Sequence, residues 1–571
     1  MSFEAFLLKM GGFGKFQTTR LLIFQLIIFS IPCSYLTSIF SLQPVDYQCK
    51  SGTSETGLRE NTNSSDLGRQ LSAESDLDSC LMYDPDFKPK AMEKDEDNET
   101  KPPIIVCEDF EVFHNYEREQ TATGEFQIFC GRDHYRQTGN ALMFIGKATA
   151  MVFGGYIGDF LGRKPSFVIF QTLTVAITAL SGLTPNLMLF LVGRFFTGLV
   201  VSCAYIYAFA LMSEMMKPNY FTWVAFLSEA TFGLGMVALS GSAFAIPNWR
   251  YLQLAVAVAL LIPTVLLIVF VPESLRWLIA KGNFKRAVQV ASRMSESNGV
   301  SFDSILENEL YNLCHQNHDE LNEESKKKKV KSEFKVAKSF AIVQIFKNRS
   351  LAIQLITLAF CWLVISAVYY GISLGGSMIP GDLYLNTALM GFFEVPAMIV
   401  ASLLSYKLGR KKVFTGSLIF TGICCSSIAI TSAYKTDLGS RILALAGRFG
   451  ITISFAVVYL YTVEIMPTSV RVTGMTFCSF TARFGAILSP YSVLLSEKIW
   501  GPIAFVIFGS VALIAGLLAL TLPETHNKPL LDSVEDGKNT KIKRQKTALH
   551  EPKLKGMSHE TDKANKSESI I

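Results

Sequence analysis

Four ionisable residues lie inside long apolar stretches of the sequence: Lys147, Glu229, Glu394 and Arg483. A charge at the centre of a bilayer costs about 2.5–3.5 kcal/mol or more, so such residues usually face a water-filled cavity or an oppositely charged partner. A guanidinium can bind a carboxylate through two parallel hydrogen bonds, and a carboxylate can bind an ammonium group. These residue types therefore indicate a site for a small organic ion. The alternative is a structural network, in which Arg483 neutralises Glu394 or Lys147 pairs with Glu229.

Aromatic residues offer a second kind of binding group, because a ring face attracts a quaternary ammonium ion with about 0.5–2 kcal/mol per contact. The aromatic candidates are Tyr205, Tyr207, Phe232, Trp362, Tyr369, Tyr370, Tyr459 and Tyr461. Aromatic side chains at membrane depth more often pack inside a bundle or form belts at the interface. Packing is therefore the first expectation for each of them except Trp362 and Tyr370.

The elements that must position these side chains are membrane helices. Of the 571 residues, 50% are hydrophobic and 18% are charged, whereas soluble domains usually carry about 25% charged residues. A membrane helix needs about 20 predominantly apolar residues. Windows of this kind occur at 21–42, 138–158, 166–183, 187–211, 222–246, 251–271, 350–372, 383–405, 413–432, 440–462, 473–495 and 502–522. The sequence thus predicts an all-α polytopic membrane protein with twelve transmembrane helices, and excludes soluble, fibrous, disordered and disulfide-rich miniprotein classes.

The polar segments between and beyond these windows define the domain organisation. The predicted parts are an N-terminus at 1–20, an N-terminal six-helix bundle at 21–271 with a large loop at 43–137, a linker at 272–349, a C-terminal six-helix bundle at 350–522, and a tail at 523–571. The tail lacks the apolar residues needed for a core, so it is predicted to be disordered. The first window is too long for a signal-peptide core and is interpreted as a retained span.

The distribution of charge predicts the orientation in the membrane. Residues 43–136 contain 21 Asp or Glu against 10 Lys or Arg, whereas residues 272–349 contain 14 Lys or Arg. Lys and Arg near membrane helices stay on the cytoplasmic side. The loop is therefore predicted to be extracellular, and the linker and both termini cytoplasmic, in a protein of the plasma membrane. A nucleic-acid partner is not expected, because the basic residues flank membrane helices and do not form one basic domain.

The predicted extracellular loop also carries features of an oxidising exterior. Four of the 11 cysteines, Cys49, Cys80, Cys107 and Cys130, fall within it. Four cysteines allow two disulfides in three possible pairings, with free thiols as the alternative. Glycosylation sequons occur at Asn63 and Asn98. The cysteine spacing offers no zinc motif, so neither a metal nor another cofactor is expected.

Several short motifs occur twice at nearly one spacing, each at the same place in its half of the chain. Gly162-Arg163-Lys164 returns 247 positions later at Gly409-Arg410-Lys411. The remaining pairs are Gly193-Arg194-Phe195 with Gly447-Arg448-Phe449, Glu214 with Glu464, and Pro272-Glu273-Ser274 with Pro523-Glu524-Thr525, at separations of 254, 250 and 251. The chain is therefore predicted to consist of two homologous six-helix halves, an arrangement typical of transporters with a substrate site between the halves.

The sequence resembles the major facilitator superfamily, and within it the organic cation/anion/carnitine (solute carrier 22) family. The resemblance covers nearly the whole chain. Three segments carry it: GDFLGRK at 158–164, PESLRWL at 272–278 and YLYTVEIMPTSVR at 459–471. Two residues depart from the usual pattern: Phe160 stands where the superfamily commonly has Arg, and Leu275 where the family commonly has Pro. The resemblance implies a major facilitator fold.

The resemblance also implies roles for the intramembrane residues. The second and fifth helices of each half line the central cavity of that fold, and these helices would carry Lys147, Glu229, Glu394 and Arg483. Trp362 and Tyr370 match positions that line the substrate site. At the position of Arg483, organic cation transporters of the family tend to have an acidic residue, and anion and carnitine transporters tend to have Arg. Arg483 and Glu394 on facing walls would suit a zwitterion of the carnitine or betaine kind.

A second group of charges is predicted at the ends of the helices. Asp159 and Arg163 are four residues apart, a spacing at which side chains on one helix face meet. We expect a conformational latch that holds the two halves in one state and releases them in another, formed by Asp159, Arg163, Glu214, Arg410, Glu464 and Arg471. The alternative is that the basic residues only anchor the cytoplasmic interface.

These observations predict a polyspecific transporter that moves small organic cations or zwitterions by alternating access. The alternatives are an organic anion transporter or exchanger, and a non-transporting receptor or scaffold with the same fold. The sequence contains no Gly-x-Ser-x-Gly, His-Glu-x-x-His or complete phosphate-loop motif, so an enzyme is not expected. The expected partners are the organic ion and the lipid bilayer, with sodium and proton as alternatives for a coupling ion.

Overall fold

The fold is described from a computed structural model of the chain, which describes residues 3–49, 81–83, 104–106, 110–113, 120–216, 218–326 and 343–526. The first half contains α1 (Phe3–Lys9), α2 (Lys15–Tyr35), α3 (Ser38–Ser41), β1 (Asp46–Cys49), β2 (Leu81–Tyr83), β3 (Ile104–Val106), β4 (Phe110–Phe113), α5 (Ala122–Glu125), α6 (His134–Leu161), α7 (Arg163–Gly182), α8 (Leu187–Met215), α9 (Pro218–Ala245) and α10 (Trp249–Phe270). The linker contains α11 (Leu275–Ala280), α12 (Phe284–Ser297) and α13 (Ser304–Lys326). The second half contains α15 (Arg349–Leu374), α16 (Leu383–Leu408), α17 (Arg410–Ala433), α18 (Asp437–Ile465), α19 (Arg471–Lys498) and α20 (Ile503–Ala519), with a 3₁₀ turn at Gly376–Met378.

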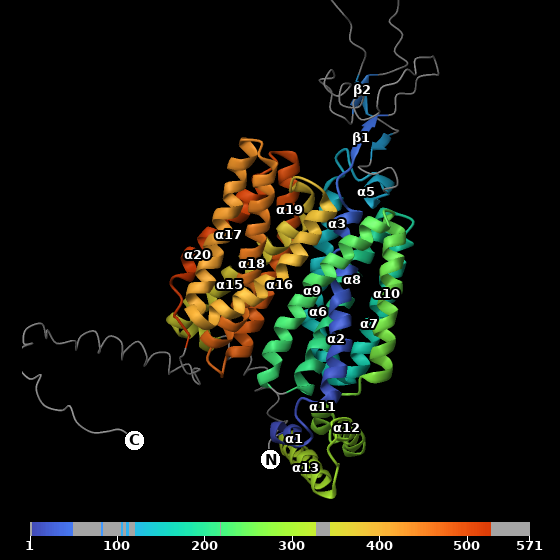
Figure 1. The fold of residues 1–571 in the computed structure, drawn as a ribbon, viewed down its shortest axis with the longest axis vertical. Helices are drawn as coiled ribbons and strands as arrows, with labels where there is room; N and C mark the ends of the chain where they lie inside the picture. The colour runs from blue at the N-terminus through green and yellow to red at the C-terminus, as the bar shows by residue number, and fades with distance from the viewer. Residues whose placement is uncertain are drawn as a thin grey trace, which may run out of the picture.

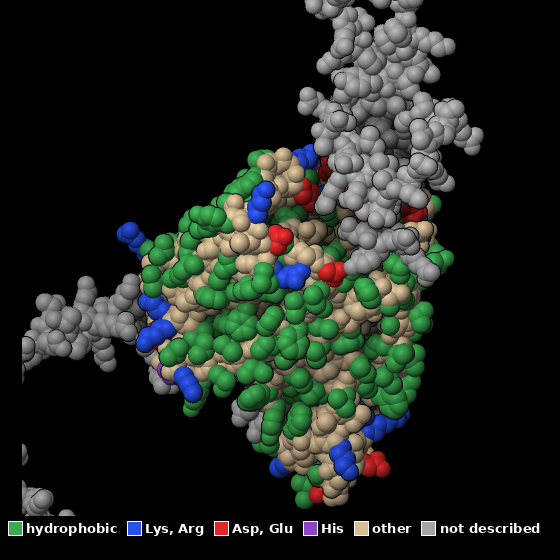
Figure 2. Space-filling view, turned by 45° about the horizontal axis from the view of Figure 1, so that its top comes forward, with side chains coloured by type: hydrophobic (Ala, Val, Ile, Leu, Met, Phe, Trp, Pro, Cys, Tyr) green, Lys and Arg blue, Asp and Glu red, His purple; other side chains and the backbone are tan. Residues whose placement is uncertain are grey.

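The first predicted window covers α2 and α3, and each of the other eleven windows coincides with one helix of the described chain. Ten helices in the described ranges are long and apolar enough to cross a membrane, and α20 is a shorter apolar helix of 17 residues. Side chains on the outer face of α10 are exposed, for example Val258, Ile262 and Val265. Hydrophobic side chains cover the flank of the molecule in Figure 2, and charged side chains gather toward its two ends. This surface is that of a protein immersed in lipid, and the predicted polytopic all-α class is confirmed.

The helices α2 and α6 to α10 form one group, and α15 to α20 form a second group that lies beside the first (Figure 1). At the same place in each half, a glycine with positive φ ends one helix and begins the next: Gly162 has φ 109° and Gly409 has φ 91°. A Cβ atom at Gly162 would lie 2.5 Å from Oε2 of Glu273, and one at Gly409 would lie 2.8 Å from Oε2 of Glu524. Only glycine fits this backbone and this close approach. The repeated Gly-Arg-Lys motif is therefore a repeated helix junction.

The ends of the molecule differ (Figure 1). At one end, which we call the loop end, α2 gives way to α3 and to the antiparallel pair β1–β4. At the other, the linker end, α1 packs with α11, α12 and α13 around a small apolar core that includes Phe6, Met10 and Leu310. The polar linker of the sequence is therefore largely helical where the structure describes it.

The two halves meet mainly through α9 against α16 and α6 against α19. Near the loop end, Arg136 of α6 pairs with Glu497 of α19, and Ser240 of α9 donates to the backbone carbonyl of Tyr384 in α16 at 2.5 Å. Among the described residues, hydrogen bonds between the halves run from this end to the level of Met151, which accepts from Ser479 and Arg483. The halves are thus tied together at the loop end.

Candidate functional site

The four intramembrane charges lie on the four helices that join the halves. Lys147 is on α6 and Glu229 on α9 of the first half, and Glu394 is on α16 and Arg483 on α19 of the second. Glycines permit the close contact: a Cβ atom at Gly233 of α9 would lie 2.7 Å from the Cβ atom of Glu394. The structure therefore brings the predicted residues to one interface in the middle of the bundle.

Lys147 is partly buried and is surrounded by aromatic rings. Its Nζ atom donates to the hydroxyl of Tyr370 at 3.2 Å. The same atom is 4.4 Å from the ring centroid of Tyr35, 5.0 Å from that of Tyr370 and 5.6 Å from that of Phe144. Among the described residues, no ion pair joins Lys147 to Glu229. The alternative of a Lys147–Glu229 pair is thus absent from this part of the structure.

Arg483 lies close to Lys147, although the two belong to opposite halves. Its Nε atom contacts Sδ of Met151 on α6 at 3.3 Å. Its guanidinium is near enough to interact electrostatically with Lys147, Tyr370 and Tyr459. Within the described ranges, no carboxylate lies within ion-pair distance of Arg483. Two cationic side chains therefore approach each other between the halves without a neutralising pair.

Glu229 of α9 is an acidic group that interacts electrostatically with Lys147. The hydroxyl of Tyr205 donates to its Oε1 atom at 3.5 Å, the outer limit for such a bond. Glu229 also interacts electrostatically with Glu394. Its carboxylate is thus only weakly satisfied where the structure describes its surroundings, which leaves it capacity to accept further hydrogen bonds.

Glu394 is paired within its own half, and its predicted place on a wall facing Arg483 in a site for a zwitterion stays a prediction. Its side chain is 2% exposed, and Oε1 accepts from Arg448 at 2.9 Å and from the hydroxyl of Tyr369. Arg448 also donates to the backbone carbonyl of Tyr369 and to Oγ of Ser373, both at 2.8 Å. A buried guanidinium and carboxylate pair in this way because neither reaches water, although Oε2 of Glu394 and Nε of Arg448 have no hydrogen-bond partner within the described part of the chain. A substrate-binding role for Glu394 stays a prediction.

Arg448 belongs to this network, although the sequence analysis used it only as part of the repeated Gly-Arg-Phe motif and not as a candidate site residue. Its counterpart Arg194 makes matching contacts in the first half, to the backbone carbonyl of Tyr35 at 3.0 Å and to Oγ of Ser38 at 2.9 Å. Each arginine of the fourth helix thus holds the first helix of its own half at a tyrosine. The signal was available, because an arginine inside an apolar window is as costly as the four charges that were selected.

Most of the other aromatic candidates are packed. Trp362 is 2% exposed, and its Nε1 donates to Thr462 at 3.0 Å while its ring meets that of Tyr459 edge-on at 4.4 Å. Tyr207 and Tyr461 donate to backbone carbonyl groups, at 2.7 and 2.6 Å. Among the described aromatic candidates, only Tyr370 makes a hydrogen bond to one of the two unpaired cations. The part that Trp362 plays in binding stays a prediction.

The charges of the predicted latch form one cluster in each half. Arg163 pairs with Asp159 at 2.7 Å and with Glu214 at 3.2 Å. Arg410 pairs with Glu464 at 3.1 Å. Arg471 contacts only its own segment in the bonds described, the carbonyl of Met466 and the hydroxyl of Thr468. The clustering agrees with the sequence, but every described pair lies within one half, so a latch between the halves stays a prediction.

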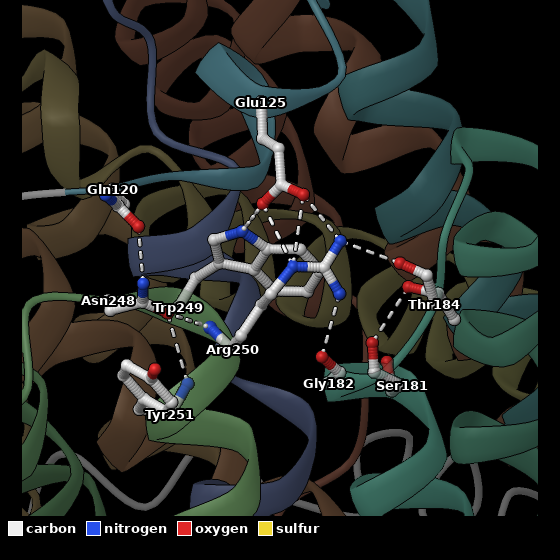
Figure 3. Close-up of polar contacts among 9 residues, drawn as sticks. All are labelled: Gln120, Glu125, Ser181, Gly182, Thr184, Asn248, Trp249, Arg250 and Tyr251. Atoms are coloured by element: carbon white, nitrogen blue, oxygen red, sulfur yellow. Dashed lines mark hydrogen bonds and ion pairs between the residues drawn. The ribbon is translucent and has the colours of Figure 1, made fainter.

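The end of the large loop is fastened to the first half by a second polar cluster (Figure 3). Arg250 donates to Glu125 and to the carbonyl groups of Gly182 and Thr184, at 2.6 to 3.1 Å. Trp249 donates to Glu125 at 2.9 Å. Although burial acts to raise it, the pKa of Glu125 is lowered, because Arg250 and Trp249 donate hydrogen bonds to the carboxylate.

Little of the loop itself can be compared with the prediction. Cys130 is bonded in a disulfide. The side chain of Cys49 and the residues Cys80, Cys107, Asn63 and Asn98 lie outside the described residues. The pairing and the glycosylation therefore stay predictions.

Comparison with known proteins gives the family. The model of the sugar (and other) transporter family matches residues 103–535. An organic cation transporter protein of Drosophila melanogaster is 28% identical over 94% of this chain and 95% of its own length, and solute carrier family 22 member 15-like of Xenopus laevis is 32% identical over 70% of this chain and 77% of its own. An inward-open structure of the xylose transporter XylE from E. coli superposes with a TM-score of 0.54 at 17% identity, covering 70% of this chain and 89% of that chain, which shows the fold. The chain belongs to the solute carrier 22 family of the major facilitator superfamily.

Proposed function

We propose that this organic ion transporter moves substrates that carry a carboxylate, and that a zwitterion of the betaine or carnitine kind is the most complete match to its site. The single observation behind this proposal is the pair of cationic side chains at the interface. Lys147 and Arg483 come from opposite halves, lie close enough to interact, and have no carboxylate within ion-pair distance among the described residues. A substrate carboxylate would receive hydrogen bonds from both.

Glu229 provides the opposite pole. Its carboxylate accepts one long hydrogen bond, from Tyr205, and it interacts electrostatically with Lys147. A substrate ammonium group between Glu229 and the rings of Tyr205 and Tyr459 would gain both an ionic and a cation–π contact. This arrangement moves the ammonium pole from Glu394, which is engaged with Arg448, to Glu229.

An organic anion is the second candidate. Two unpaired cations against one weakly satisfied carboxylate leave an excess of positive charge between the halves. Like charges in a site of low dielectric repel strongly, so a purely cationic substrate fits this excess least well.

The position of the site supports alternating access. The two cationic side chains of the proposed site come from α6 and α19, which belong to halves that are joined at the loop end. Rocking of two such halves about a central site is the usual motion of transporters built from repeats. The positive-inside rule supports an orientation in the plasma membrane with the acidic loop outside and the basic linker in the cytoplasm, and in that orientation the loop end faces the exterior. The described conformation would then be closed to the outside.

Uptake into cells or proteoliposomes tests the substrate class. The panel is carnitine, p-aminohippurate and tetraethylammonium, each with and without sodium. We expect uptake of one or both carboxylates, loss of that uptake in Arg483→Ala at unchanged surface expression, and retention in Arg132→Ala, a change at an exposed arginine near the loop end. Uptake of tetraethylammonium alone would refute the proposal. Absence of uptake of every organic ion would favour the receptor alternative.

A further inference from the structure

Three aromatic rings from three helices surround the ammonium group of Lys147. Tyr35 comes from α2, Phe144 from α6 and Tyr370 from α15, and all three rings lie within 5.6 Å of Nζ. The rings are themselves buried and pack together, since the centroids of Phe144 and Tyr370 are 4.6 Å apart. Cages of this composition and spacing are the ones that proteins use to bind quaternary ammonium groups.

The cage explains how Lys147 is tolerated. Its ammonium group has no carboxylate within ion-pair distance in the described part of the chain, and a buried charge without a partner is costly. The three ring faces and the hydroxyl of Tyr370, at 3.2 Å, take the place of that partner. This aromatic cage is thus filled by a cation that belongs to the protein.

We infer that Lys147 is a tethered occupant of an aromatic cation site, and that it determines substrate charge by keeping quaternary ammonium ions out of that site. An incoming cation meets both a filled cage and a like charge. A carboxylate meets the N–H groups of Lys147 that Tyr370 does not use, because an ammonium group has three donors. The inference deepens the proposed function and rests on it, since it gives the reason why carboxylate-bearing substrates are preferred.

Removal of the lysine side chain tests this inference directly. Lys147→Ala vacates the cage, and tetramethylammonium serves as the probe because it is a quaternary cation without a carboxylate. We expect binding of tetramethylammonium to purified Lys147→Ala to be at least about tenfold tighter than to the wild type, measured by ligand-induced thermal stabilisation and by competition with substrate. Lys147→Ser provides a second small uncharged replacement if the alanine variant does not reach the surface.

Three further variants separate the cage from a simple change of charge. Lys147→Met removes the charge but keeps the cage filled, and Lys147→Arg keeps both charge and bulk, so neither is expected to gain tetramethylammonium binding. Tyr35→Leu in the Lys147→Ala background removes one ring face at similar volume and is expected to abolish the gain. An equal gain in Lys147→Met, or no gain in either small variant, would overturn the inference.

The outcome is distinguishable from that of the proposed function. Carboxylate uptake by the wild type without any gain of tetramethylammonium binding in Lys147→Ala and Lys147→Ser would refute the cage inference alone. Wild-type uptake restricted to tetraethylammonium would refute the proposed function, and the comparison of small and bulky replacements at Lys147 would still decide whether the side chain occupies a cation site.

Discussion

The buried pair of Glu394 and Arg448 provides the sharpest test of the energetics. Their side chains are 2% and 1% exposed, so Glu394→Gln leaves a guanidinium without a counter-charge in a dry environment. Removing one partner of a buried pair costs about 3–5 kcal/mol. Arg448 keeps its bonds to the carbonyl of Tyr369 and to Ser373, which retains part of its stabilisation. We therefore expect a loss near the lower limit, about 3 kcal/mol.

A double replacement shows whether this cost arises from the orphaned charge. Glu394→Leu with Arg448→Leu removes both charges, and such changes are often neutral or stabilising by comparison with the broken pair. Thermal unfolding of the purified protein in detergent is the assay. We expect the apparent Tm of Glu394→Gln to fall by several degrees and the double variant to recover most of the fall. A double variant as unstable as the single one, or an unchanged Tm in Glu394→Gln, would contradict the reasoning.

Three further predictions concern substrate charge, gating and pH. Arg483→Asp reverses one of the two free positive charges, so uptake should shift from carboxylate-bearing toward purely cationic substrates by about tenfold or more in relative rate; equal loss of both would argue against the assigned role. Arg136→Gln removes the ion pair with Glu497 that joins the halves at the loop end, so a cysteine placed on the loop-end part of α6 should react faster with a membrane-impermeant reagent, with unchanged labelling as the contrary result. The folded-state pKa of Glu125 is lowered, so its stabilising contacts should persist at pH values above the ordinary pKa of a carboxylate and weaken only as pH falls through that lowered pKa. Limited proteolysis of the loop across pH, in the wild type and in Glu125→Gln, measures this. Release of the wild-type loop already near pH 6 would refute it.

Much of the site was predictable at the level of which helices carry it. An ionisable residue in an apolar window is conspicuous because its transfer into lipid is so costly, and two six-helix halves follow from repeated motifs such as Gly162-Arg163 and Gly409-Arg410. The same rule applied consistently would have selected Arg194 and Arg448. Their importance was missed because they lie within the Gly-Arg-Phe repeats and were interpreted as markers of duplication.

The linear sequence by itself determined the number, order and approximate bounds of the helices, because hydrophobic length and glycine-dependent junctions are local properties. Only the tertiary structure decided which charges meet. Glu394 binds Arg448 and not Arg483, and Lys147 lies among the rings of Tyr35, Phe144 and Tyr370 and not against Glu229. The partner of a buried charge depends on how each helix is rotated and which helix of the other half packs against it, and these quantities are set by the packing of all twelve helices together.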